Sequence, residues 1–182
     1  MTIDPTLPFK LIDRYGFTQH DIGLFILFFT ATCALLTIGL LFVPERTPKL
    51  PLIVTGSFFL AVSPFLIGPS RLFGIPDTLS VQQAGLVIGG LGKALVMSFV
   101  YGWGCDSAAS IFPNEVEEAN NVFAELYSVF FPLSIAILPL LGSGLNKSIG
   151  FEYAMEVIGS LLGIFAILLV IFFLTNNKST SS

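Results

Sequence analysis

The sequence has few of the residues on which disulfide frameworks, metal sites and nucleic-acid surfaces depend. It contains two cysteines, Cys33 and Cys105, and one histidine, which give neither a disulfide framework nor metal-ligand spacing. Charged residues make up only 11%, with 12 acidic against 8 basic. The basic residues are scattered singly, so we expect no nucleic-acid partner and no polybasic patch for anionic lipid. No motif typical of a hydrolytic triad or a nucleotide-binding loop is present, and we expect neither an enzyme nor a bound cofactor or metal.

What the chain does have is long apolar runs, since 54% of its residues are hydrophobic and the mean hydropathy is +0.87. The five runs are Ile22–Val43, Leu50–Ile67, Val81–Trp103, Val122–Leu141 and Tyr153–Leu174. Each is near the roughly 20 residues that a helix needs to cross a hydrocarbon layer about 30 Å thick. The sequence therefore predicts an all-α integral membrane protein with about five transmembrane helices.

This pattern divides the chain into three parts. Residues 1–21 form an N-terminal stretch, residues 22–174 a five-helix membrane domain, and residues 175–182 a polar tail that we expect to be disordered. No basic segment leads directly into a short apolar one at the N-terminus, so the first membrane helix is expected to direct its own insertion. An odd number of spans puts the termini on opposite sides of the bilayer and suggests part of a larger bundle.

Local signals predict where the helices begin and end. Residue pairs typical of helix starts precede three runs: Thr18 with Asp21, Thr47 with Pro48, and Ser80 with Gln83. A fourth pair, Asn114 with Glu117, is placed to start a helical extension that leads into Val122–Leu141. The glycines at 142 and 144 predict a break after that run.

Lys93 lies in the middle of the third run, where spanning alone does not explain it. A lysine at a helix centre costs about 2.5–3.5 kcal/mol to insert, and such groups usually face a bundle interior or a water-filled cavity. We predict an acidic or carbonyl partner for Lys93 inside the assembled bundle. The alternatives are packing against backbone carbonyls without further role, or an ammonium group that reaches the interface.

The fourth run carries a polar stripe, because five of its residues recur at steps of three and four: Glu118, Asn121, Glu125, Ser128 and Pro132. The first two are predicted to lie at the level of the lipid headgroups. For Glu125 and Ser128, with Tyr127 nearby, an interfacial position and the lining of an aqueous path both remain open.

The third run also contains Gly85 and Gly89 at a four-residue spacing, with Gly90 and Gly92 adjoining. Small residues at this spacing let two helix backbones approach closely, so we predict tight helix packing on this face. A dimerisation motif is the weaker alternative, because bundles use the same spacing internally.

In order along the chain, several short motifs resemble the C-terminal half of a major facilitator superfamily transporter, most closely the vesicular amine transporter-like branch. The motifs are Asp4-Pro5-Thr6-Leu7-Pro8 at the end of the seventh helix, Tyr15-Gly16 and Ile22-Gly23 before the eighth, Gly68-Pro69-Ser70 after the ninth, Gly89–Gly92 in the tenth, and Gly142, Gly144 and Ile149-Gly150-Phe151 between the last two. The resemblance implies that residues 1–21 contain the end of helix 7 and a loop, and that residues 22–174 correspond to helices 8–12.

The resemblance also implies roles for single residues. Asp4 takes the position of a membrane carboxylate that could act in cation recognition or coupling. Amine carriers place carboxylates in their tenth and eleventh helices, and these carboxylates have no clear match in this chain. Lys93 lies near the first of those positions and Tyr127 near the second. A lysine there disfavours a cationic substrate and suits an anionic one. The candidate substrate-binding or coupling residues are thus Asp4, Lys93, Glu125, Tyr127 and Ser128.

The expected function is secondary active transport of a small organic solute by alternating access, with proton coupling open, in the plasma membrane or an intracellular vesicle membrane. The expected partners are the bilayer, the solute, and a missing N-terminal transporter half or a second copy of this chain. One alternative is a non-transporting membrane interaction subunit, in which the glycine face packs on a partner protein and Lys93 pairs with an acidic residue of that partner. Another is a non-functional fragment of a transporter gene. Seven further helices encoded upstream of Met1 would favour the carrier.

Overall fold

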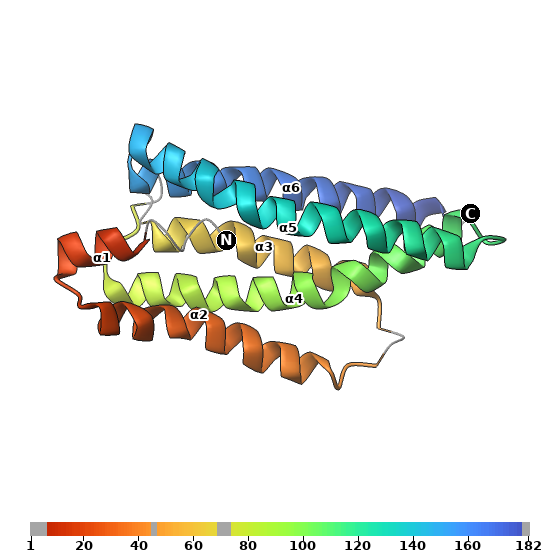
Figure 1. Cartoon of the computed structure of the whole chain (residues 1–182), viewed down its shortest axis with the longest axis horizontal. Coiled ribbons are helices and arrows are strands. Elements are labelled where there is room, and N and C mark those ends of the chain that lie inside the picture. Colours follow the sequence, from red (N-terminus) through yellow and green to blue (C-terminus); the bar gives the residue numbers. More distant parts are fainter. Residues whose placement is uncertain (1–6, 45–46, 69–73, 180–182) are drawn as a thin grey trace.

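The computed structural model describes residues 7–44, 47–68 and 74–179, and this part of the chain is built from six helices and loops. Figure 1 shows the long helices side by side along one axis. Their bounds are α1 Leu7–Tyr15, α2 Gln19–Leu40, α3 Lys49–Ile67, α4 Leu79–Ile111, α5 Val116–Ile149 and α6 Phe151–Ser179. Helices α2 to α6 are each long and apolar enough to cross a membrane. The prediction of an all-α chain with five helices long and apolar enough to cross a membrane is confirmed for the described residues.

The helix starts follow the local sequence in one case of three. Thr18 is the N-cap of α2 and forms the predicted capping box with Asp21, whose carboxylate accepts bonds from the Thr18 backbone amide and hydroxyl at 3.0 and 2.7 Å. The pair of Thr47 with Pro48 is placed wrongly, because Pro48 is itself the N-cap of α3 and makes no side-chain cap bond.

The predicted cap at Ser80 with Gln83 is also wrong, because α4 begins at Leu79 after the N-cap Thr78. The Thr78 carbonyl accepts bonds from the backbone amides of Val81 and Gln82 at 3.1 Å. Main-chain bonds thus close the first turn without a capping side chain.

Helix α5 does not break at residues 142 and 144 but continues to Ile149. It ends at Gly150, whose φ of +84° is readily adopted only by glycine. Glycines within the hydrocarbon layer can stay helical, because breaking the helix there would leave backbone N–H and C=O groups without hydrogen-bond partners. Gly142 instead lines a cavity of about 360 Å³ between α3, α5 and α6.

Helices α4 and α5 contain 33 and 34 residues. At 1.5 Å per residue each is about 50 Å long, well beyond a hydrocarbon layer of about 30 Å. The polar stretch Cys105–Asn121 is therefore mostly helical, and the predicted extension into the fourth run is present, although Asn114 does not cap it.

Helix α6 similarly continues to Ser179. The tail predicted to be disordered from residue 175 therefore begins as helix, because adding a residue to an existing helix costs little.

Helix α4 occupies the centre of the packing, since α2, α3 and α5 all contact it, and α6 contacts α3 and α5. The predicted close packing of its glycines is confirmed. A Cβ atom added at Gly92 would lie 2.7 Å from the Gly56 carbonyl oxygen of α3, and one added at Gly90 would lie 2.7 Å from the Phe29 carbonyl oxygen of α2. The glycine face is thus buried within this chain, and the alternative in which it packs on a partner is wrong.

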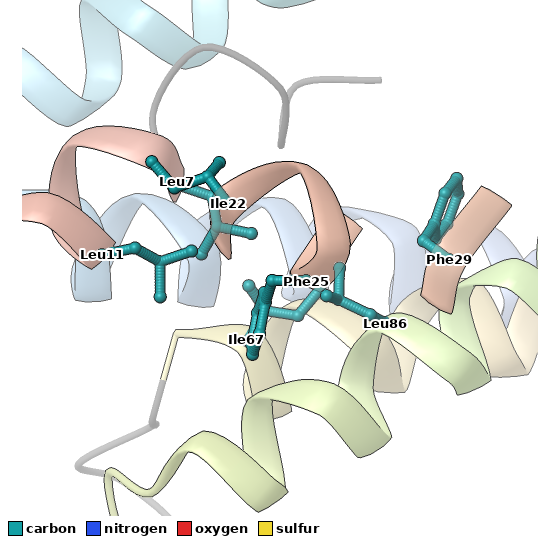
Figure 2. Packing of buried hydrophobic residues seen from close by; sticks show 7 residues of the cluster. All are labelled: Leu7, Leu11, Ile22, Phe25, Phe29, Ile67 and Leu86. Carbon is teal, nitrogen blue, oxygen red and sulfur yellow. The ribbon is translucent and has the colours of Figure 1, made fainter. Parts of the chain in front are cut away.

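Helix α1 joins the bundle through an apolar cluster at one end. Figure 2 shows its seven residues, which come from four helices: Leu7, Leu11, Ile22, Phe25, Phe29, Ile67 and Leu86. Leu7 and Leu11 of α1 are fully buried in it. The N-terminal stretch, predicted as a helix end followed by a loop, thus contains helix α1, which is anchored to the bundle.

Figure 1 places the α2–α3 connection, the α4–α5 turn and the C-terminal end of α6 at one end of the bundle. The resemblance implies that this end is cytoplasmic. We expect a C-terminal tag to be digested in sealed vesicles that expose the cytoplasmic side. We expect any glycan to be attached at the sequon Asn146-Lys147-Ser148, near the opposite end. Carbonate extraction with protease protection tests this orientation. A protected tag, or a glycan at Asn177, would reverse it.

Candidate functional site

Lys93 lies near the middle of α4, about 21 Å from its first residue by the helical rise. Its side chain is half-buried, and its Nζ atom lies 5.4 Å from the centre of the Phe29 ring on α2. In the part of the chain that the structure describes, no carboxylate lies within 4 Å of this nitrogen. Among the described residues, the ammonium group of Lys93 therefore lies over an aromatic ring, and the acidic or carbonyl partner predicted for the assembled bundle stays a prediction.

The ring does not offset the cost of placing this ammonium group at membrane depth. A cation over an aromatic ring contributes roughly 0.5–2 kcal/mol, whereas a lysine at a helix centre costs about 2.5–3.5 kcal/mol. The difference has to come from water, from an anion or from a group outside the described residues. Lys93 is thus the strongest candidate for a functional residue inside the bundle.

Tyr127 belongs to an aromatic cluster between α4 and α5. Its ring stacks on Phe131 with centroids 5.4 Å apart and meets the Tyr101 ring edge-on at 5.4 Å. Phe123 completes the cluster, with its ring centre 5.8 Å from that of Tyr101. The tyrosine that the sequence singled out therefore faces α4, and it helps to hold α5 against that helix.

Glu125 and Ser128 lie on the outer side of α5. Both are exposed in this chain, and the Ser128 hydroxyl donates to the Ala124 carbonyl of its own helix at 2.7 Å. The whole predicted stripe from Glu118 to Pro132 is likewise exposed. These residues therefore do not meet Lys93, and they form a polar strip that no other described helix covers.

Asp4, the remaining candidate, lies outside the described residues. The structure thus brings Tyr127 to α4 and leaves Glu125 and Ser128 on a free surface, while Lys93 faces α2. The five candidates do not form one compact constellation among the residues described.

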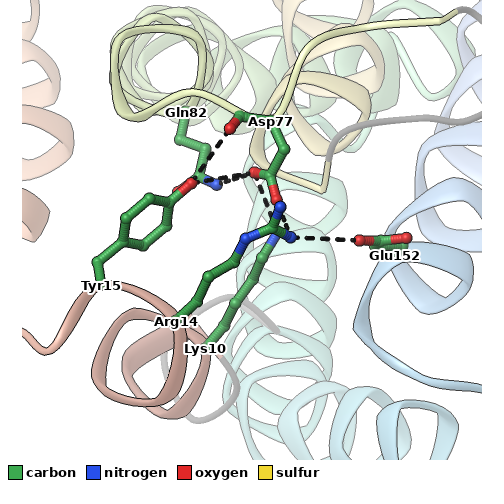
Figure 3. A network of polar contacts seen from close by, with 6 residues as sticks. All are labelled: Lys10, Arg14, Tyr15, Asp77, Gln82 and Glu152. Carbon is green, nitrogen blue, oxygen red and sulfur yellow. Dashed lines mark hydrogen bonds and ion pairs between the residues drawn. The ribbon is translucent and has the colours of Figure 1, made fainter.

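A polar network at the opposite end from the α4–α5 turn was not predicted. Figure 3 shows Asp77, in the loop before α4, surrounded by Lys10, Arg14 and Tyr15 of α1 and by Gln82 of α4. Arg14 forms an ion pair with Asp77, and Gln82 Nε2 donates to Asp77 Oδ1 at 2.6 Å. Lys10 Nζ lies 3.5 Å from the same Oδ1. Asp77 therefore connects α1 to the start of α4.

The network also reaches α6, because an Arg14 nitrogen lies 3.9 Å from a Glu152 carboxylate oxygen. Burial lowers the pKa of Lys10, while the nearby carboxylates of Asp77 and Glu152 act in the opposite direction. Burial also raises the pKa of Tyr15, as does the charge of Asp77. Sequence reasoning missed this site because Tyr15 and Asp77 are 62 residues apart and neither belongs to a motif.

Comparison of this chain with known protein families, curated proteins and solved structures finds no match. The functional argument therefore rests on the residues and on their arrangement in the bundle.

Proposed function

We propose that this chain is the C-terminal helical bundle of a secondary transporter of a small organic solute, in the manner of the major facilitator superfamily. The motifs that resemble the vesicular amine transporter-like branch support the proposal. In this arrangement α2 to α6 take the places of helices 8–12. Transport proceeds by alternating access, in which this bundle rocks against another around a site near the middle of the membrane.

The observation that carries the proposal is the unequal burial of the membrane helices. In α3, 39% of the apolar segment is buried inside the chain, but in α5 the share is only 6%. The uncovered surface of α5 includes Glu125 and Ser128, which are poorly suited to lipid tails. A second helical bundle and the water between the two would solvate such a face.

The proposed location is the plasma membrane or an intracellular vesicle membrane, as the resemblance implies. A proton gradient is the proposed driving force. The partners are a second set of helices, which supplies the other wall of the pathway, and the transported solute.

Expressed alone, the chain is expected to insert into membranes but to show no saturable uptake, because its helices supply only one wall of the pathway. The test is reconstitution into liposomes with an imposed proton gradient and labelled organic cations and anions outside. The matched sample is the same chain coexpressed with an N-terminal half of such a transporter, which should accumulate solute. Gradient-dependent uptake by the chain alone would require a homo-oligomer with a complete pathway.

A membrane interaction subunit is the competing function, and the exposed Glu125 gives it a contact for a partner helix. It predicts a different result in the same experiment. Coexpression with a transporter N-terminal half would produce no accumulation of any solute tested, even where the two form a stable complex.

A further inference from the structure

Lys93 is the only basic residue within the five apolar runs, since the other seven lie outside them. It is not placed at an end from which its side chain can reach the interface. Fourteen residues of α4 precede it and eighteen follow it, or about 21 and 27 Å of helix. The positive charge is therefore held at depth by the fold.

The charge also lies on a face of α4 that the chain leaves partly open. Met97 and Tyr101 follow Lys93 at four-residue steps along this face, and they are 40% and 42% exposed. Helices α2 and α5 flank α4, with Phe29 contributed by the first and Tyr127 by the second. The open face thus combines one cation with aromatic surface.

No carboxylate of the described residues lies within 4 Å of the Lys93 ammonium group. The carboxylates of Asp77, Glu152 and Asp106 instead form ion pairs with Lys10, Arg14 and Lys49. Glu125 lies on the outer side of α5 and makes no ion pair with Lys93. The ammonium group keeps its N–H donors available to a ligand, while the Phe29 ring holds it in place.

We propose that Lys93 binds the acidic group of a small organic anion that reaches this face of α4 from water. The inference rests on the proposed function and names its substrate class. A carboxylate or sulfonate would accept charge-assisted hydrogen bonds from the ammonium group, and the aromatic residues would contact its apolar part. An organic cation would be repelled by Lys93, so this chain differs in charge preference from the amine carriers that it resembles.

The test uses the full chain in lipid nanodiscs, with Cys33 and Cys105 replaced by alanine and a single thiol introduced by Met97→Cys. This thiol is one turn from Lys93 on the exposed face. Its rates of modification are measured with two methanethiosulfonate reagents of similar size, a negatively charged sulfonatoethyl and a positively charged trimethylammonioethyl compound. Each rate is divided by that of the same reagent with a free thiol.

We expect the anionic reagent to react roughly tenfold faster than the cationic one, because one positive charge attracts the first and repels the second. Lys93→Arg should keep this preference, and Lys93→Gln should abolish it. Equal rates in the presence of Lys93 would mean that another acidic group already neutralises it, and absence of reaction would mean that water does not reach this face. Either result would overturn the inference.

The inference and the transporter proposal fail separately. An intact anion preference without uptake in any reconstituted sample would count against transport and leave the anion site standing. Uptake of organic cations, equally fast in wild type and Lys93→Gln, together with equal reagent rates, would overturn the anion site and leave transport standing.

Discussion

Gly92→Leu is expected to destabilise the bundle by about 3 kcal/mol or more, since overpacking a tight contact commonly costs 1–3 kcal/mol and more when backbone has to move. A Cβ atom at position 92 would lie 2.7 Å from the Gly56 carbonyl oxygen and 2.8 Å from the Leu60 backbone nitrogen. Both are main-chain atoms of α3, so no side-chain rotation relieves the contact. Helices α3 and α4 have to separate, and unfolding in detergent, followed by circular dichroism, measures the loss.

Gly163→Leu is the matched control. It makes the same chemical change in α6, where nothing lies within 4 Å of an added Cβ atom. This variant should keep a transition close to that of the unmodified chain, because leucine favours a helix more than glycine does. Equal stability of the two variants would show that α3 and α4 do not pack as closely as described here.

Asp77→Ala is expected to have the second largest effect, a loss of about 2–4 kcal/mol, because removing one partner leaves buried charges uncompensated. Lys10 and Asp77 have side chains only 11% and 13% exposed. The change deprives the Lys10 ammonium group of its nearest carboxylate and removes the acceptor of the Gln82 amide. Helix α1 should detach first, which limited proteolysis between α1 and α2 would reveal as faster cleavage.

Two further variants make this test specific. Asp13→Ala removes the same charge from the exposed side of α1 and should be nearly neutral. Adding Lys10→Met to Asp77→Ala should restore about 1 kcal/mol, because it removes an ammonium group left without its carboxylate. If Asp77→Ala were as stable as Asp13→Ala, the network would not hold α1 to the bundle.

Features that depend on neighbouring residues were predictable from the sequence. The capping box of Thr18 with Asp21 involves residues three positions apart, so its geometry is local. Close packing at Gly85–Gly92 was predictable in kind, because the spacing of small residues on a helix is visible in the chain. Which helices fill that face was not predictable, since α2 and α3 both approach it, at Gly90 and Gly92 respectively.

The helix ends were harder to predict than the helices. Two glycines close together, at 142 and 144, are typical of a helix break, yet the chain turns only at Gly150, where the backbone takes a positive φ. Composition does not distinguish a glycine that ends a helix from one that packs inside it. The position of Tyr127 shows the same limit for side chains, because its contact with Tyr101 depends on how α4 and α5 are rotated against each other.

The sequence by itself determined the all-α class and the five helices long and apolar enough to cross a membrane, because hydropathy is a local property and the bilayer sets the length of a spanning helix. It also determined that Lys93 lies in the middle of an apolar run. Only the tertiary structure decided that Phe29 covers this lysine, that Glu125 lies on an uncovered surface, and that Asp77 connects α1 to α4. These outcomes depend on which faces of distant helices meet, and contacts between residues as far apart as Tyr15 and Asp77 leave no pattern in a single sequence.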